Sequence, residues 1–356
     1  MLLDRIEHRW IEAFAKTLEL SGIGEALPVA ILSETQSRPI NVHLAELALL
    51  RLGARPFHLK AVTPAQTSSL PIRSTGASLA VGGHPGLLAS LTAVPVIVDL
   101  TVEGLMHAPE LGDILKSGAR VITISNEHPD ALERLVPDPN LAPKIRNAAR
   151  LCRTASTMSV TSEAGTELDI GMEGARTVGV SGFTEKPGTL AHWPGGLVVS
   201  FPAAGQVNGV LVLDAGDINL TFKRYLTAPI RLVIENDYVT DIQGSGADAE
   251  MMRRYFEGFG EEDAYAVSHV GFGLNENARY EALTCYDQRD LNGTELRAFA
   301  GNFLFSTGAN EFAGRFTRGH FDLPVRACAI KLDDAEVVKQ GQVDWSLLSA
   351  DPEEQG

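Results

Sequence analysis

Residues 28–54 read PVAILSETQSRPINVHLAELALLRLGA, and this stretch decides the fold of the first part of the chain. Its opening segment, PVAILSE (28–34), is mostly apolar, which is typical of a buried strand. The segment 41–54 is rich in leucine and alanine and has a glycine near its end, which predicts a helix. A buried strand followed at once by a helix predicts a βαβ unit.

The same alternation continues along the chain. Strands separated by helices build a parallel sheet, so we expect an α/β domain. Pro129 opens a further helical segment, because proline is favoured in the first turn of a helix. An amphipathic helix that ends near Gly22 precedes the first strand. The further predicted strands are RPFHLKAV (55–62), SLAVGG (78–83), VPVIVDL (94–100) and ARVITIS (119–125).

The second half of the sequence has a different character. Glycines become frequent and the apolar runs become short, which is typical of antiparallel strands joined by turns. Two runs meet at Asn236-Asp237, a pair that favours a hairpin turn, and residues 247–260 predict a helix. We therefore expect an α/β domain with a parallel sheet over residues 1–152 and a β-rich α+β domain over residues 153–356.

Composition excludes several classes of partner. The 356 residues carry a formal net charge of −15, which disfavours nucleic acid and anionic membranes. Three cysteines without a CxxC pattern indicate a reducing compartment and no disulfide framework. The first 22 residues are charged at intervals and do not resemble a signal peptide, and no apolar run reaches membrane-spanning length. We expect a cytoplasmic protein.

The segment GHFDLP (319–324) carries the first sign of a metal site. In an extended strand, residues two apart point to the same face, so His320 and Asp322 would project together. Pro324 supports an extended backbone, because the residue before a proline avoids the helical region. An imidazole and a carboxylate on one face supply two of the three protein ligands of a mononuclear non-haem site.

His269 is the best candidate for the third ligand. It lies among apolar residues and glycines in AVSHVGFGLNENARY (266–280), and a neighbouring strand or loop of the same sheet would bring it to His320. Two histidines and one carboxylate on one face of a metal leave positions open for substrate. A His-Asp pair that is purely structural, and a buried histidine that binds no metal, are the alternatives to this interpretation.

Two more histidines occupy informative places. His107 follows the predicted strand 94–100, and residues beyond the carboxyl ends of parallel strands line the crevice where α/β domains bind ligands. His192 lies in EKPGTLAHWPGG (185–196), which we interpret as a shaped loop.

Several segments together resemble the 2,5-dihydroxypyridine 5,6-dioxygenases, non-haem iron enzymes of nicotinate and nicotine breakdown. The resemblance implies a fold shared with thermophilic metallo-aminopeptidases. It extends from about residue 95 to about residue 325. The segments that carry it are DLTVEGLMHAPEL (99–111), GARVITISNEHPDALERL (118–135), HWPGGLVV (192–199), SHVGFGLNENAR (268–279) and GHFDLPV (319–325).

The resemblance also implies roles for individual residues. Fe(II) would be held by His269, His320 and Asp322, and His107 would act as the acid–base residue beside the substrate. His192, Glu185 and Ser306 would line the substrate pocket. The partners would be a small aromatic N-heterocycle and O₂, and the ring would open between C5 and C6 to give N-formylmaleamate.

Two other functions stay open at this point. One is a hydrolase of the metallo-aminopeptidase type with a two-metal site, for which Glu185 and Glu276 are candidate carboxylates. The other is a binding protein that kept the fold without catalysis. The apolar segment AHWPGGL (191–197), taken as exposed, further predicts a homo-oligomer.

Overall fold

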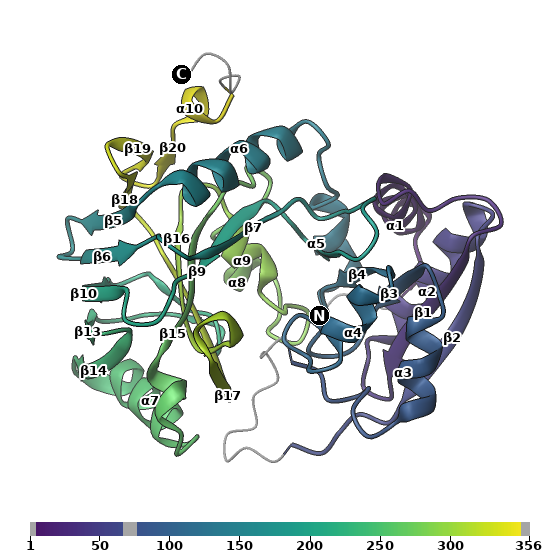
Figure 1. Cartoon of the computed structure of the whole chain (residues 1–356), viewed down its shortest axis with the longest axis horizontal. Coiled ribbons are helices and arrows are strands. Elements are labelled where there is room, and N and C mark those ends of the chain that lie inside the picture. Colours follow the sequence, from purple (N-terminus) through teal and green to yellow (C-terminus); the bar gives the residue numbers. More distant parts are fainter. Residues whose placement is uncertain (1–4, 67–76, 350–356) are drawn as a thin grey trace.

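A five-stranded parallel sheet forms the centre of the first part of the molecule, in the order β2-β1-β3-β4-β8. The computed structural model describes residues 5–66 and 77–349. The predicted α/β domain with a parallel sheet is confirmed, and Figure 1 shows this sheet and its helices on one side of the molecule. The strands are β1 (Pro28–Glu34), β2 (Arg55–Ala61), β3 (Val96–Asp99), β4 (Arg120–Ile124) and β8 (Leu190–Trp193).

Helices cover both faces of this sheet, which explains why its central strands are apolar without alternation. In β1, Val29 and Ile31 belong to the core cluster beneath α1 and α2, whereas Ala30 and Leu32 belong to the cluster beneath α3 and α4. The helices are α1 (His8–Leu20), α2 (Pro39–Arg51), α3 (Pro85–Thr92), α4 (Leu111–Lys116) and α5 (Pro129–Arg134).

One predicted strand is wrong. SLAVGG (78–83) forms a loop that leads into α3, although Ala80 and Val81 are buried. Gly83 adopts a positive φ of 76° just ahead of the helix, a conformation that ends extended structure. The apolar run suggested a strand because its residues are buried, but a buried apolar segment can also be a loop.

The second part of the molecule contains two larger antiparallel sheets, as predicted for a β-rich domain. One has the order β17-β16-β15-β9-β7, and the other has the order β14-β13-β10-β6-β5-β18-β19-β20. The first sheet consists of β7 (Arg176–Val180), β9 (Leu197–Phe201), β15 (Val267–Gly273), β16 (Phe303–Asn310) and β17 (Arg315–Val325). The second consists of β5 (Thr157–Ser162), β6 (Glu167–Gly171), β10 (Val207–Leu213), β13 (Ile230–Glu235), β14 (Tyr238–Gln243), β18 (Cys328–Leu332), β19 (Ala335–Lys339) and β20 (Gln342–Val343).

The inner faces of these two sheets share one hydrophobic core, which is the largest in the molecule. Asn236 and Asp237 take positive φ angles of 49° and 77° and join β13 to β14, so the predicted hairpin is confirmed. The remaining elements are β11 (Ile218–Asn219), β12 (Arg224–Tyr225), α6 (Leu141–Thr154), α7 (Gly246–Glu257), α8 (Ala282–Cys285), α9 (Thr294–Ala298), α10 (Trp345–Ser349) and the 3₁₀ turns η1 (Glu262–Tyr265) and η2 (Glu311–Ala313).

Strand β8 links the two parts of the molecule. It comes from the second half of the chain, yet it pairs in parallel with β4 at the edge of the first sheet. We keep the division near residue 152 as a proposal, with β8 as a strand that the second part returns to the first. The segment 191–197 around β8 is largely buried, with Trp193 fully enclosed, so it does not support the predicted homo-oligomer.

Two further expectations concern the whole chain. The three cysteines are all free, and Cys152 and Cys328 are buried. Among the residues described, no helix combines the length and the apolarity that crossing a bilayer requires.

Candidate metal centre

The side chains of His269, His320 and Asp322 converge in the β-rich part of the molecule. One ligand atom from each lies within 4.8 Å of the other two, and all three residues are buried. His269 comes from β15, whereas the other two come from β17 in the same sheet, with β16 between them. The predicted triad is therefore brought together, from two strands that are not neighbours.

The strand geometry of β17 explains how His320 and Asp322 share a face. The strand is regular here, so alternate side chains point the same way, as the sequence predicted. Gly308 of β16 lies opposite His320. Its φ is +119°, and a Cβ added there would lie 2.1 Å from the carbonyl oxygen of Gly319, so this close approach requires glycine.

A β-bulge directs His269 toward the same point. The register between β15 and β16 shifts between Val267 and Val270, which is where His269 lies. Bulges often re-aim one side chain of a strand next to a functional site. The Phe201 ring packs against His269 with their centroids 5.3 Å apart, and His320 lies 5.4 Å from His269 by the same measure.

Asp322 is held by Arg297, which the sequence patterns did not identify, and by Ser306, which was expected to line the substrate pocket. Nε of Arg297 donates a hydrogen bond to Oδ2, and the Ser306 hydroxyl donates one to Oδ1. The two histidine rings are also close, with Nε2 of His320 3.3 Å from Oδ2 and Nε2 of His269 3.7 Å from Oδ1. Burial raises the pKa of Asp322, whereas Arg297 and the two histidines together lower it by a larger amount. The pKa therefore lies well below its ordinary value.

Contacts with the first part of the molecule fix the position of Arg297. This residue lies on the short helix α9, whose start is held by the buried carboxylate of Glu127 in the loop after β4. Glu127 accepts backbone hydrogen bonds from Asn292, Gly293 and Thr294, at 2.6, 2.8 and 2.9 Å. The loop after β4 therefore fixes the position of the Arg297 guanidinium, which faces the candidate metal ligand Asp322.

The chemistry of the cluster fits a divalent first-row metal. Burial lowers the pKa of His269 to about 3, so its ring is neutral near pH 7, as a metal ligand must be. Nδ1 of His269 and Nδ1 of His320 are buried without a hydrogen-bond partner among the described residues. Two imidazoles and one carboxylate are the ligand set of mononuclear non-haem iron sites.

His107 reaches the cluster from the other side. It lies in the loop after β3, at the carboxyl end of the parallel sheet, as predicted. Its ring centroid is 5.2 Å from that of His320. The buried carboxylate of Asp99 shapes this loop by accepting backbone hydrogen bonds from Thr101 and Leu105.

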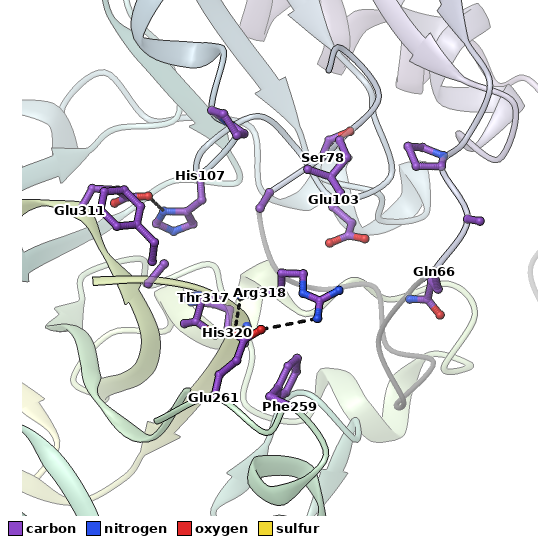
Figure 2. A pocket seen from close by; sticks show the side chains of 18 of the residues that line it. Gln66, Ser78, Glu103, His107, Phe259, Glu261, Glu311, Thr317, Arg318 and His320 are labelled. Carbon is purple, nitrogen blue, oxygen red and sulfur yellow. Dashed lines mark hydrogen bonds and ion pairs between the residues drawn. The ribbon is translucent and has the colours of Figure 1, made fainter. Parts of the chain in front are cut away.

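A carboxylate lies beside the ring of His107. Nδ1 of His107 is 3.7 Å from Oε1 of Glu311, a contact that is longer than a hydrogen bond. Figure 2 shows Glu311 beside the ring, and His107 lowers the pKa of Glu311. Nε2 of His107 is buried and has no hydrogen-bond partner in the part of the chain that the structure describes.

Two cavities meet at His107 and His320. The inner cavity has a volume of about 90 Å³ and is lined by His269, His320 and Asp322. The outer cavity has a volume of about 400 Å³ and is the one drawn in Figure 2. Both cavities are lined by Glu103, His107 and His320. The wall of the inner cavity includes His107, His192, His269, Arg297, His320 and Asp322.

The three residues expected to line the substrate pocket differ in position. His192 lines the inner cavity, but it is the third residue of strand β8 and does not lie in a loop, because pairing with β4 extends to this point. Ser306 is fully buried and contacts the site through Asp322. Burial lowers the pKa of His192 to about 4.

The structure does not bring Glu185 to the site, so this expectation is corrected. Glu185 is exposed and lies near Gly22, beside the side chain of Arg120. Arg120 begins β4, whereas His107 and His192 lie at the carboxyl ends of their strands. Because the strands are parallel, these positions are at opposite ends of the strands.

Comparison with known proteins identifies the family. The family model for 2,5-dihydroxypyridine 5,6-dioxygenase (NicX) matches residues 9–344. The chain is 35% identical over 336 residues to the 2,5-dihydroxypyridine 5,6-dioxygenase of Pseudomonas putida KT2440, which covers 93% of this chain and 95% of that protein.

Solved structures agree with this result. The structure of 2,5-dihydroxypyridine dioxygenase from Pseudomonas putida KT2440 matches with a TM-score of 0.89 at 33% identity, over 98% of both chains. AmpT from Thermus thermophilus matches with a TM-score of 0.60 at 14% identity, over 94% of this chain and 99% of that chain, which shows a shared fold alone. The chain therefore belongs to the 2,5-dihydroxypyridine 5,6-dioxygenase family, as its sequence motifs suggested.

Proposed function

We propose that this protein is an Fe(II)-dependent dioxygenase that opens the ring of 2,5-dihydroxypyridine, or of a close hydroxypyridine, between C5 and C6. The observation that carries the proposal is the buried cluster of His269, His320 and Asp322. The proposed reaction consumes one O₂ per ring and places both oxygen atoms in the product. Family membership supports this substrate class.

His269, His320 and Asp322 would hold the iron. When bound, the metal would supply a site at which the ring and O₂ come together and through which electrons pass from one to the other. Arg297 and Ser306 would hold Asp322 in the orientation that the metal requires, since the orientation of a ligand depends on the groups hydrogen-bonded to it. The neutral state of His269 also favours metal binding.

His107 would accept a proton from the substrate hydroxyl and later return a proton as the ring opens. Its Nε2 is buried and has no partner among the described residues, so it is available to accept a proton. Glu311 beside Nδ1 favours a proton on that nitrogen, which leaves the lone pair on Nε2. This is the arrangement that a general base requires.

The inner cavity would select a flat ring with polar substituents. Phe201 gives it an aromatic wall beside His269 and His107. His192 lies at the carboxyl end of β8 in the same cavity, and its ring is neutral near pH 7, so it would exchange a hydrogen bond with an uncharged hydroxyl or ring nitrogen. An aromatic wall beside hydrogen-bonding groups that fix the orientation of the ligand is typical of small-molecule recognition.

Oxygen uptake tests this function directly. The chain is loaded anaerobically with Fe(II), and oxygen consumption is followed after 2,5-dihydroxypyridine is added. We expect uptake that depends on both the ring and the iron. A protein that instead hydrolyses peptides without O₂ would have the function of the aminopeptidase type, and the proposal would be wrong.

A further inference from the structure

We propose that the outer cavity is a receiving site for an uncharged hydroxylated ring, and that Glu34 makes this cavity reject rings that carry a carboxylate. The inference deepens the proposed function, because it specifies which hydroxypyridines reach the metal. The outer cavity shares Glu103, His107 and His320 with the inner one, so we infer that a ring entering from this side passes along its wall.

The ionisable groups of the outer cavity are mostly acidic. Among the residues that the structure describes, four carboxylates line it against one guanidinium, that of Arg318. Arg318 forms an ion pair with Glu261, which also accepts a hydrogen bond from the Thr317 hydroxyl. Figure 2 shows Glu261, Thr317 and Arg318 on one side of the cavity. The carboxylates are Glu34, Glu103, Glu261 and Glu311.

Glu34 differs from the other carboxylates because one of its oxygens is buried and has no hydrogen-bond partner in the part of the chain that the structure describes. It is the last residue of β1 and is 3% exposed. Its Oε1 accepts hydrogen bonds from the Ser78 hydroxyl at 2.9 Å and from the backbone N–H of Val102 at 3.0 Å. Its Oε2 has no hydrogen-bond partner among the described residues.

A buried, unpartnered carboxylate oxygen is costly unless a donor reaches it. Because Glu34 lines the cavity, a ligand can supply that donor. The hydroxyl and ring N–H groups of a hydroxypyridine are such donors. Pro109, Phe259 and Phe316 add apolar surface to the same cavity, which suits the faces of an aromatic ring.

The same carboxylate opposes anions. A ring carboxylate brought near Glu34 would face a like charge in a partly desolvated site, and like-charge contacts suppress wrong partners effectively. The hydrogen bonds to Oε1 hold the side chain in place, so it cannot turn away easily. The cavity would therefore admit the neutral ring and exclude its carboxylated analogues.

A matched pair of ring probes tests this inference. 2-Hydroxypyridine is neutral, and 6-hydroxynicotinate is the same ring with one carboxylate. Binding of each probe to the full chain is measured by calorimetry under argon, with and without Fe(II), so that no oxygen-dependent reaction can proceed. We expect the neutral probe to bind more tightly by about tenfold or more, since like charges about 12 Å apart at an effective dielectric of 20 already reduce affinity by a factor of about ten.

Variants of Glu34 separate its charge from its shape. In Glu34→Gln, the affinity for 6-hydroxynicotinate should rise by about tenfold, whereas that for 2-hydroxypyridine should change little. Glu34→Asp keeps the charge and should keep the discrimination. Glu235→Gln makes the same charge change at an exposed position outside both cavities and serves as the control.

The inference is overturned if Glu34→Gln leaves the ratio of the two affinities unchanged, if the wild type binds both probes equally, or if neither probe binds. These outcomes are independent of turnover. Loss of the proposed function would appear separately, as an absence of oxygen uptake in an iron-loaded wild type that still discriminates between the probes.

Discussion

Nε of Arg297 donates a hydrogen bond of 2.5 Å to Oδ2 of Asp322. This contact places a positive charge against the buried carboxylate of the proposed metal site. The pair lies where a short helix meets a strand, and the helix itself is fixed by Glu127 from the other part of the molecule. The cluster therefore depends on the relative placement of both parts.

Replacing Arg297 should destabilise the metal-free protein. In Arg297→Gln the buried Asp322 loses its main compensating charge, so the free energy of unfolding should fall by about 3 kcal/mol. Bound metal would supply that charge instead, and the loss should shrink when Fe(II) is added. Urea unfolding with and without Fe(II) measures both values, with Arg297→Lys as the charge-conserving control. An equal loss in both conditions would contradict this account.

Ser306→Ala should weaken metal binding without abolishing it. The hydroxyl orients Asp322, and loss of such an orienting group typically reduces metal affinity by about 10- to 100-fold. Competition with a chelator of known affinity measures the change. An affinity equal to that of the wild type would show that the hydroxyl does not position the ligand.

His107→Ala should separate catalysis from metal binding. Iron content should stay at the wild-type level, whereas turnover should fall by about 10²- to 10⁴-fold, the usual contribution of a general acid–base residue. Glu311→Gln should have a smaller effect, because its contact with His107 is long. Glu185→Gln is the matched control and should keep full activity, because Glu185 lies away from both cavities. Undiminished turnover in His107→Ala would remove this residue from the mechanism.

His192 should make the protein less stable in mild acid. Its pKa is about 4 in the folded state and near 6.5 when unfolded, so between these values the unfolded chain binds more protons. The contribution of neutral His192 to the free energy of unfolding is therefore complete above pH 6.5, and it is lost as the pH falls toward 4. His192→Gln should reduce the slope of unfolding free energy against pH by up to about 1.4 kcal/mol per pH unit in this window. An unchanged slope would show that His192 is already protonated or is exposed in the folded state.

Local patterns predicted a large part of the fold. The apolar run of β1 and the helix after it identified a parallel sheet, because buried strands and helices differ in period and length. The same reasoning failed for residues 78–83, where buried apolar side chains belong to a loop. It also could not foresee β8, whose pairing with β4 joins segments about 70 residues apart through contacts that leave no local signature.

The proximity of two of the proposed metal ligands was predictable for a related reason. His320 and Asp322 are two apart on one strand, so local periodicity places them together. Arg297 and Glu311 reach the site through tertiary contacts, and neither lies in a pattern that separates it from ordinary surface charge. Glu185 shows the reverse error, since the family resemblance placed it in the pocket, whereas the structure places it beside Arg120, at the opposite end of the strands from His192.

Anaerobic titration of the full chain with Fe(II) tests the central claim most directly. Binding is followed by elemental analysis after removal of free metal, in the wild type and in the Asp322→Ala and His320→Ala variants. Two histidines and one carboxylate predict saturation at one iron per chain in the wild type and no retained iron in either variant. Saturation at two metals per chain, or full retention in both variants, would contradict the assignment.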